Sequence, residues 1–234
     1  MNFRSLVPAD VWRDLIGRGR RRTYSPGSVL LIQGESPDCV IVLLDGLVKV
    51  TQGNEDGDEL TLMLRGPGEV LGEMGALLGR PRSATVTAAY RCATVVLPAH
   101  AFRQFLKRHR LDEKIYQLTV ERLNSHERLH ADLRRLSRVG RMARVVSHIA
   151  DEVGRPHGPA GLLVELGMAR PELAAMASMS RSSALAALSE LQSADILTLG
   201  RRHLVVDDTV RLRAVARNGR LPGRIDRADG GQAM

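Results

Sequence analysis

The hydrophobic period of the chain changes near Pro98, and this change constrains the fold more than any other feature. From Thr23 to Leu97 the chain consists of short runs rich in Val, Leu, Ile and Thr, such as CVIVLLDGLVKVT and SATVTAAYRCATVVL. Runs of this kind at near-regular intervals predict an antiparallel sandwich or barrel. Beyond Pro98 apolar residues recur every three or four positions, which is typical of helices. The chain is therefore predicted to be an α+β protein.

Glycines and short polar segments separate the β-type runs. Residues 54–57 (NEDG) are predicted to form a hairpin tip. Ahead of this region, residues 8–17 carry apolar residues on one side and predict a short amphipathic helix. The basic run Arg18–Arg22 is interpreted as a solvated face rather than a nucleic-acid patch. The turns between the runs are assigned to Gly46, Gly53, Gly57, Gly66 and Gly68.

A long helix is predicted to extend to about Leu136. Its seam is of the kind that two helices bury against each other. Arg122 and Ser125 interrupt this seam, and polar residues there weaken packing unless something satisfies them. The pattern leaves two explanations open, a device that sets helix register or a ligand that lies against the helix. The seam consists of Leu111, Ile115, Leu118, Arg122, Ser125, Leu129, Leu133 and Leu136.

The last third of the chain has the spacing of a helix-turn-helix. After a helix at Val139–Val153 and a predicted loop at 155–161, helices are predicted at Pro171–Ala177 and Arg181–Ala194. Ser180 is the expected N-cap of the second, and only a short SMS segment joins the pair. Residues 198–206 then predict a hairpin that turns at a glycine, like the wing of a winged helix. An ordinary helical hairpin remains the alternative, and residues 215–234 are predicted to be a disordered tail.

Composition excludes several classes of protein. The net charge of +8 favours a polyanionic partner, although the excess is spread along the chain. All seven histidines lie at or beyond position 100, outside the β-rich region, which argues against a metal-dependent barrel enzyme or a haem sensor. Cys39 and Cys92 form no cluster for an iron–sulfur centre. We therefore expect a cytoplasmic protein with no catalytic residues, no metal, no resident cofactor and no membrane segment.

The stretch GEMGALLGRPRSATV, residues 72–86, carries the most specific chemistry. Glu73 offers an acceptor for a hydroxyl, and Arg82 offers a planar guanidinium that matches phosphate oxygens. Gly72 and Gly75 let a ligand approach the backbone, and a short helix at 73–78 would point free N–H groups at an anion. A surface loop closed by a Glu73–Arg82 ion pair is the alternative. The spacing favours a ligand with a phosphate and a ribose hydroxyl.

In this order, these elements resemble the cyclic-AMP receptor protein/FNR (CRP/FNR) family of bacterial transcription regulators, over roughly residues 8–210. The segments YSPGSVLLIQGESPDCVIVLLDGLVKV, GEMGALLGRPRSATV and VGRMARVVSHIADEV carry the resemblance. It implies a cyclic-nucleotide-binding β-roll, or jelly-roll, at 1–108 and a dimerisation helix at 109–137. It also implies a winged helix-turn-helix DNA-binding domain at 138–214.

The resemblance implies roles for residues of the β-roll and of the long helix. Glu73 would accept from the ribose 2′-hydroxyl, Arg82 and Ser83 would hold the cyclic phosphate, and Arg122 would brace Glu73. The base-edge positions hold His126 and Glu127, which are not the family's small hydroxyl or amide residues. Cyclic AMP is the expected effector, while cyclic GMP and cyclic di-GMP remain open. The phosphate cradle would be Gly72, Met74 and Gly75, and the apolar side of the base would face Val50, Leu62 and Met63.

The resemblance also assigns a DNA-reading surface. Arg181 matches the first base-reading residue of the family, whereas Ser182 and Ala186 replace a Glu and a second Arg. DNA binding with an altered or relaxed sequence preference follows, because each bidentate Arg–guanine contact discriminates strongly. Expected partners are double-stranded DNA, a second copy of the chain and RNA polymerase, the alternative being a helix-turn-helix that contacts a protein. Phosphate contacts are expected from Arg170, Ser180, Ser183, Arg201 and Arg202.

Overall fold

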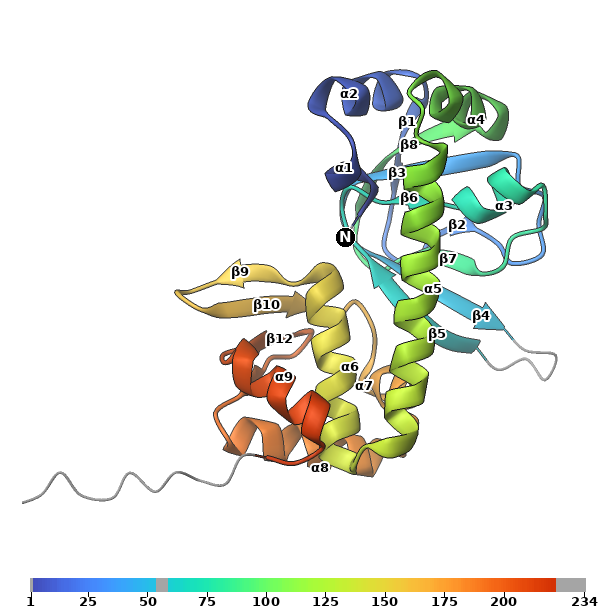
Figure 1. Cartoon of the computed structure of the whole chain (residues 1–234). Helices are drawn as coiled ribbons and strands as arrows, with labels where there is room; N and C mark the ends of the chain where they lie inside the picture. The colour runs from blue at the N-terminus through green and yellow to red at the C-terminus, as the bar shows by residue number, and fades with distance from the viewer. Residues whose placement is uncertain (1, 54–58, 222–234) are drawn as a thin grey trace, which may run out of the picture.

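The computed structural model describes residues 2–53 and 59–221 and divides the chain into a β-roll, a long helix and a smaller C-terminal unit (Figure 1). Two antiparallel four-stranded sheets form the β-roll, in the orders β1-β8-β3-β6 and β2-β7-β4-β5. The predicted antiparallel architecture is confirmed. The strands are β1 (Arg20–Tyr24), β2 (Val29–Leu31), β3 (Cys39–Asp45), β4 (Val48–Gly53), β5 (Glu59–Arg65), β6 (Val70–Leu71), β7 (Thr85–Ala88) and β8 (Cys92–Pro98).

Strand β3 shows why part of the β-roll has an unbroken run of apolar residues in its sequence. Its Ile41 and Leu43 face the second sheet, while Val40 and Val42 pack against helices on the other side. Because successive side chains point to opposite faces, a strand covered on both sides needs apolar residues at every position. The covering helices are α1 (Phe3–Leu6), α2 (Ala9–Gly17), which was predicted, and α4 (Ala99–Arg108).

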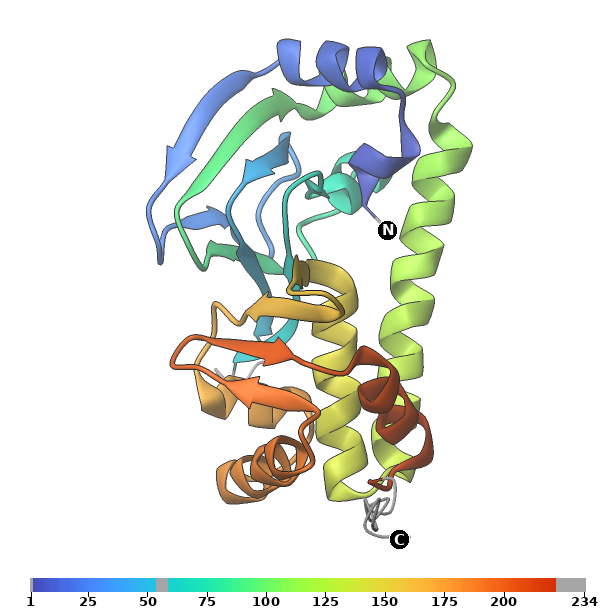
Figure 2. The same cartoon turned by 90° about the vertical axis from the view of Figure 1, so that its left-hand side faces the viewer.

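Helix α5 (Asp112–Arg135) runs alongside the β-roll and continues down to the C-terminal unit (Figures 1 and 2). The predicted seam is buried, but within the chain rather than against a second long helix. Leu118 belongs to the core beneath α1 and α2, and Leu129 and Leu133 pack against the C-terminal unit. The opposite face carries Tyr116 and Leu123, whose exposures are 69% and 59%.

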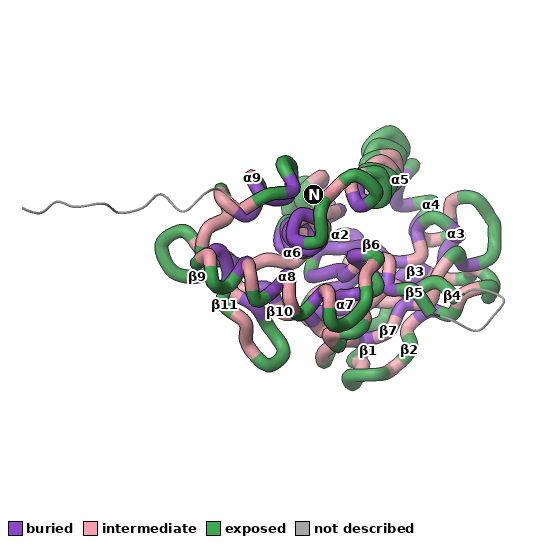
Figure 3. Tube along the Cα trace, turned by 90° about the horizontal axis from the view of Figure 1, so that it is seen from below, coloured by how far each residue is buried: buried purple, intermediate pink, exposed green. Residues whose placement is uncertain are grey.

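The C-terminal unit is built around α6 (Arg138–Val153), which is buried along most of its length (Figure 3). The predicted helix-turn-helix and wing are confirmed. A four-stranded sheet in the order β11-β12-β10-β9 closes the unit. The other elements are β9 (Arg155–His157), β10 (Gly161–Glu165), α7 (Arg170–Met176), α8 (Arg181–Ser193), β11 (Leu197–Leu199), β12 (His203–Val206) and α9 (Thr209–Asn218).

Two predictions for this unit are wrong. Residues 155–161 were expected to form a loop, but they contain β9 and the start of β10, in a hairpin that turns through Gly158. The tail expected from residue 215 is helical to Asn218, because Asp208 caps α9 and Val215 packs into the core. Residues 222–234 and the predicted hairpin tip at 54–57 lie outside the described residues. In the part of the chain that is described, no helix combines the length and apolarity needed to cross a membrane.

The imidazole of His148 is buried in α6 and gives folding a pH dependence. Only 6% of the residue is exposed, and its Nε2 has no hydrogen-bond partner among the described residues. Burial lowers the pKa of His148, with Arg144 and Arg65 acting in the same direction and Glu152 opposing them. The charged form is therefore more stable in the unfolded chain than in the folded one.

The free energy of unfolding is expected to fall as the pH drops below about 6.5, the ordinary pKa of histidine. The unfolded chain takes up this proton first, because its histidine pKa is higher. Stability is therefore lost as the pH falls from the unfolded pKa through the folded pKa, at about 1.4 kcal/mol per pH unit between these two pKa values. His148→Gln should flatten this dependence in urea titrations at pH 5–8. His157→Gln, at an exposed position, should leave it unchanged. Parallel curves for wild type and His148→Gln would contradict the assignment.

Candidate ligand pocket and helix-turn-helix

The turn between β6 and α3 (Glu73–Leu78) shapes one side of a pocket. Gly72 adopts the left-handed conformation there, with a φ of 77°. A Cβ at this position would lie 2.5 Å from Nη1 of Arg82 and 2.9 Å from Leu31. Only glycine therefore satisfies both the backbone and the space. The short helix predicted at 73–78 is confirmed.

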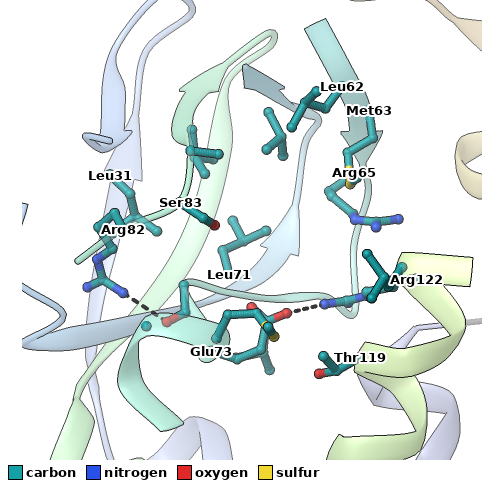
Figure 4. Close-up of a pocket in the computed structure, with 18 residues that line it drawn as sticks. Leu31, Leu62, Met63, Arg65, Leu71, Glu73, Arg82, Ser83, Thr119 and Arg122 are labelled. Atoms are coloured by element: carbon teal, nitrogen blue, oxygen red, sulfur yellow. Dashed lines mark hydrogen bonds and ion pairs between the residues drawn. The ribbon is translucent and has the colours of Figure 1, made fainter. Parts of the chain in front are cut away.

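A cavity of about 300 Å³ opens between the β-roll and α5 (Figure 4). Its wall is largely apolar, with charged groups at one end. Ten of the predicted ligand residues line it, namely Gly72, Glu73, Met74, Gly75, Arg82, Ser83, Val50, Leu62, Met63 and Arg122. The remaining lining residues are Leu31, Arg65, Val70, Leu71, Ala84, Val86, Thr119 and Leu123.

Glu127 is exposed and does not line the cavity within this chain, so its contact with a base stays a prediction. The side chain of His126 lies outside the described part of the chain. Sequence reasoning missed two lining residues of α5, Leu123 one turn before Glu127 and Thr119 two turns before it. Oγ1 of Thr119 is buried and has no hydrogen-bond partner among the described residues. The i, i+3 and i+4 spacing of 119, 122 and 123 was the signal that could have found them.

Arg82 is held in the cavity wall by the backbone. It is 6% exposed, and its guanidinium donates to the carbonyl oxygens of Gly72 at 2.8 Å and Cys39 at 2.6 Å. Figure 4 shows Arg82 on the opposite side of the cavity from Arg122. Ser83 follows at the exposed rim. These contacts fix the guanidinium while leaving other N–H groups available to an anion.

Glu73 pairs with Arg122 and not with Arg82, so the alternative of a surface loop closed by Glu73 and Arg82 is wrong. The Glu73 carboxylate is buried in the first turn of α3, where the helix dipole favours a negative charge. Nη1 of Arg122 donates to it, as Figure 4 shows, and Nη2 donates to Glu69. Burial lowers the pKa of Arg122, but Glu73 and Glu69 more than offset this and raise it. The predicted brace between Arg122 and Glu73 is confirmed.

Helix α8 presents its N-terminal end to solvent. Oγ of Ser180 caps the helix by accepting from the N–H of Ser183, and Arg181 and Ser182 are exposed. Ala186 is only half-buried, and Leu185 between these positions is exposed, a residue that the sequence did not single out. The structure thus leaves a readable helix face, whose contacts with DNA stay a prediction.

The wing carries the other predicted DNA residues. Arg201 and Arg202 are exposed, and the Arg202 guanidinium lies 5.3 Å above the ring of Tyr90 in the β-roll. Arg170 donates from Nη2 to the carbonyl of Gly200 at 3.0 Å, which ties α7 to the wing. Part of this basic surface is therefore engaged within the chain.

Comparisons with known proteins agree with this division. A family model described as a cyclic nucleotide-binding domain matches residues 21–109, and a Crp-like helix-turn-helix domain matches residues 140–215. A CRP-like cAMP-activated global transcriptional regulator of Mycobacterium tuberculosis is 26% identical over 195 residues, 83% of this chain and 87% of that protein.

Two solved structures support the fold. FixK2 from Bradyrhizobium japonicum has a TM-score of 0.72 at 18% identity, over 84% of this chain and 96% of that one. The c-di-GMP-responsive global regulator CLP of Xanthomonas campestris has a TM-score of 0.68 at 22% identity, over 85% of this chain and 99% of that one. The arrangement of β-roll, long helix and helix-turn-helix is therefore shared with known regulators.

Proposed function

Because the chain belongs to the CRP/FNR family of transcription regulators, we propose that a cyclic nucleotide is the effector that fills the cavity between the β-roll and α5. The chain is a ligand-responsive DNA-binding regulator of this family. The main support for the proposal is that the buried Glu73–Arg122 pair lines a largely apolar cavity, with Arg82 fixed across from it. Such a site offers a hydroxyl acceptor, a phosphate-binding guanidinium and an apolar surface for a base.

In this site Glu73 accepts from the ribose 2′-hydroxyl and Arg82 contacts the cyclic phosphate. Val50, Leu62 and Met63 cover the base, and the Thr119 hydroxyl takes the place proposed earlier for Glu127. A hydroxyl can donate or accept, so Thr119 suits the edge of either purine. Cyclic AMP is the effector we propose, with cyclic GMP as the alternative. A volume of about 300 Å³ is at the small end for ligand sites, which disfavours a cyclic dinucleotide.

We propose that two copies of the chain pair through the exposed face of α5. Tyr116 and Leu123 lie two turns apart on that face, which is the spacing of a helix–helix seam. Leu123 also lines the cavity, so effector and partner helix would meet at one residue. A two-fold dimer would place its two α8 helices in major grooves ~34 Å apart. RNA polymerase, expected from the resemblance, is the partner that this DNA-bound dimer would contact.

Arg82→Ala should weaken cyclic AMP binding about 10- to 100-fold, because a charge-assisted contact to the phosphate is lost. Isothermal titration calorimetry measures this directly. Arg80→Ala removes an exposed guanidinium two positions away and should bind like wild type. Arg82→Lys keeps the charge but cannot reach both carbonyls and a phosphate, so it should fall in between. Equal affinities for wild type and both Arg82 variants would overturn the proposed pocket.

Arg181→Ala should lower the preference for specific over random DNA about 5- to 150-fold, the value of one bidentate base contact. The operator is first obtained by selecting genomic fragments bound by the wild-type protein with cyclic AMP. Anisotropy titrations then compare it with random DNA, using Arg217→Ala, on the exposed side of α9, as the control. Selection that enriches no sequence would favour a helix-turn-helix that contacts a protein.

A further inference from the structure

We propose that a buried chain of ion pairs carries the effector signal from Glu73 to α6, with Glu69 and Arg65 as its positioning residues. This inference rests on the proposed function of the pocket. It identifies side chains through which occupation of the β-roll would reach the DNA-binding unit. The sequence pattern did not single out Glu69 or Arg65.

The first part of this series of ion pairs is Arg122, whose guanidinium contacts two carboxylates. Nη1 donates to Glu73 at the pocket, and Nη2 donates to Glu69, which precedes β6. Arg65 at the end of β5 lies 3.9 Å from the other oxygen of Glu69. It also donates to Oε1 of Glu152 at 2.7 Å, and Glu152 belongs to α6. Charges of alternating sign thus run without a break from the pocket to the DNA-binding unit.

Burial strengthens the coupling between neighbouring charges in this series of ion pairs. Arg65, Glu69 and Glu73 are each less than a tenth exposed, so water screens their charges weakly. Removing one partner of a buried pair leaves an uncompensated charge, which is strongly unfavourable. A shift at one member therefore changes the preferred position of the next. Burial raises the pKa of Glu69 although Arg122 and Arg65 oppose the rise, as expected for a carboxylate that is costly to bury.

Effector binding would perturb the Glu73–Arg122 ion pair. A ribose hydroxyl that donates to Glu73 competes with Arg122 for the same carboxylate, so Arg122 would shift its hydrogen bonds toward Glu69. Nε of Arg122 is buried and has no partner among the described residues, so the guanidinium has a donor to spare for a second arrangement. The attraction between Glu69 and Arg65 would then weaken, and the ion pair between Arg65 and Glu152 would become stronger.

Space for such a rearrangement exists beside the chain. A second, polar cavity of about 520 Å³ lies between the β-roll, α5 and α6. Arg65, Glu69, Arg122 and Glu152 all line it. His148 also lines it, with Nε2 at 3.8 Å from Glu152. Charged side chains can therefore move here without displacing core residues.

Helix α6, which carries Glu152 at the end of the series, packs against the helix-turn-helix. Helix α6 contributes Met142, Val146 and Ile149 to the same core as Ala187 and Leu191 of α8. A rotation or translation of α6 is transmitted to α8, because packed cores rearrange as units. The ion pair between Arg65 and Glu152 thus biases the orientation of α8.

The test uses the full-length protein and a coupling factor, the ratio of DNA dissociation constants without and with saturating cyclic AMP. Wild type is expected to fall within the usual 5- to 150-fold range. Glu152→Gln should bind cyclic AMP within twofold of wild type by calorimetry, yet lose at least four-fifths of the coupling factor. Asp151→Asn is the matched control, since Asp151 is exposed and pairs with Arg213 instead.

A double-mutant cycle separates a relay from a general loss of structure. Arg65→Gln and Glu152→Gln act on one contact, so the double variant should lose no more coupling than the stronger single variant. Arg65→Lys, the milder change, should show the same pattern with a smaller loss. Multiplicative losses in the double variant, or wild-type coupling in Glu152→Gln, would overturn the relay. A wild-type protein that binds no cyclic nucleotide would instead overturn the proposed function, and the relay with it.

Discussion

The placement of one buried guanidinium between two buried carboxylates determines how the halves of this protein meet. Arg122 lies in the middle of α5, and both of its carboxylate partners belong to the β-roll. Ion pairs removed from water are tolerated only when geometry and hydrogen bonding are nearly complete. The pair Glu73–Arg122 therefore fixes the register of α5 along the β-roll. The same register sets where the later residues of α5 lie, and with them the C-terminal unit that packs on Leu129 and Leu133.

The position of α5 also explains where the cavity ends. Leu118 and Thr119 lie against the β-roll, whereas Leu129 and Leu133 pack on the C-terminal unit. The cavity ends above Glu127, which is exposed and does not line it. The polar edge of a bound base would therefore meet α5 at Thr119 rather than one turn below Arg122.

Local signals were readable from the sequence, and contacts between distant segments were not. Gly72, Glu73 and the Ser180 cap were predicted because each depends on a few neighbouring residues. Arg122 stood out because a charge interrupts an apolar seam, and its partner Glu73 followed from the resemblance. The seam itself was misjudged, since periodicity says that a helix face is buried but not what covers it. Glu69, Arg65 and Glu152 gave no pattern, because only the docking of α6 beneath the β-roll brings them together.

The strands β4 and β5 connect the same two regions by a second route. Val50 and Met63 are directly paired and both line the cavity, whereas Lys49 and Thr61 reach Glu172 instead. Both of these side chains donate to Glu172 in the first turn of α7. A ligand that presses on the apolar wall would therefore move strands that hold the helix-turn-helix. The C-terminal unit is thus tied to the pocket at α6 through charges and at α7 through strands, and a change in its orientation has to satisfy both contacts at once.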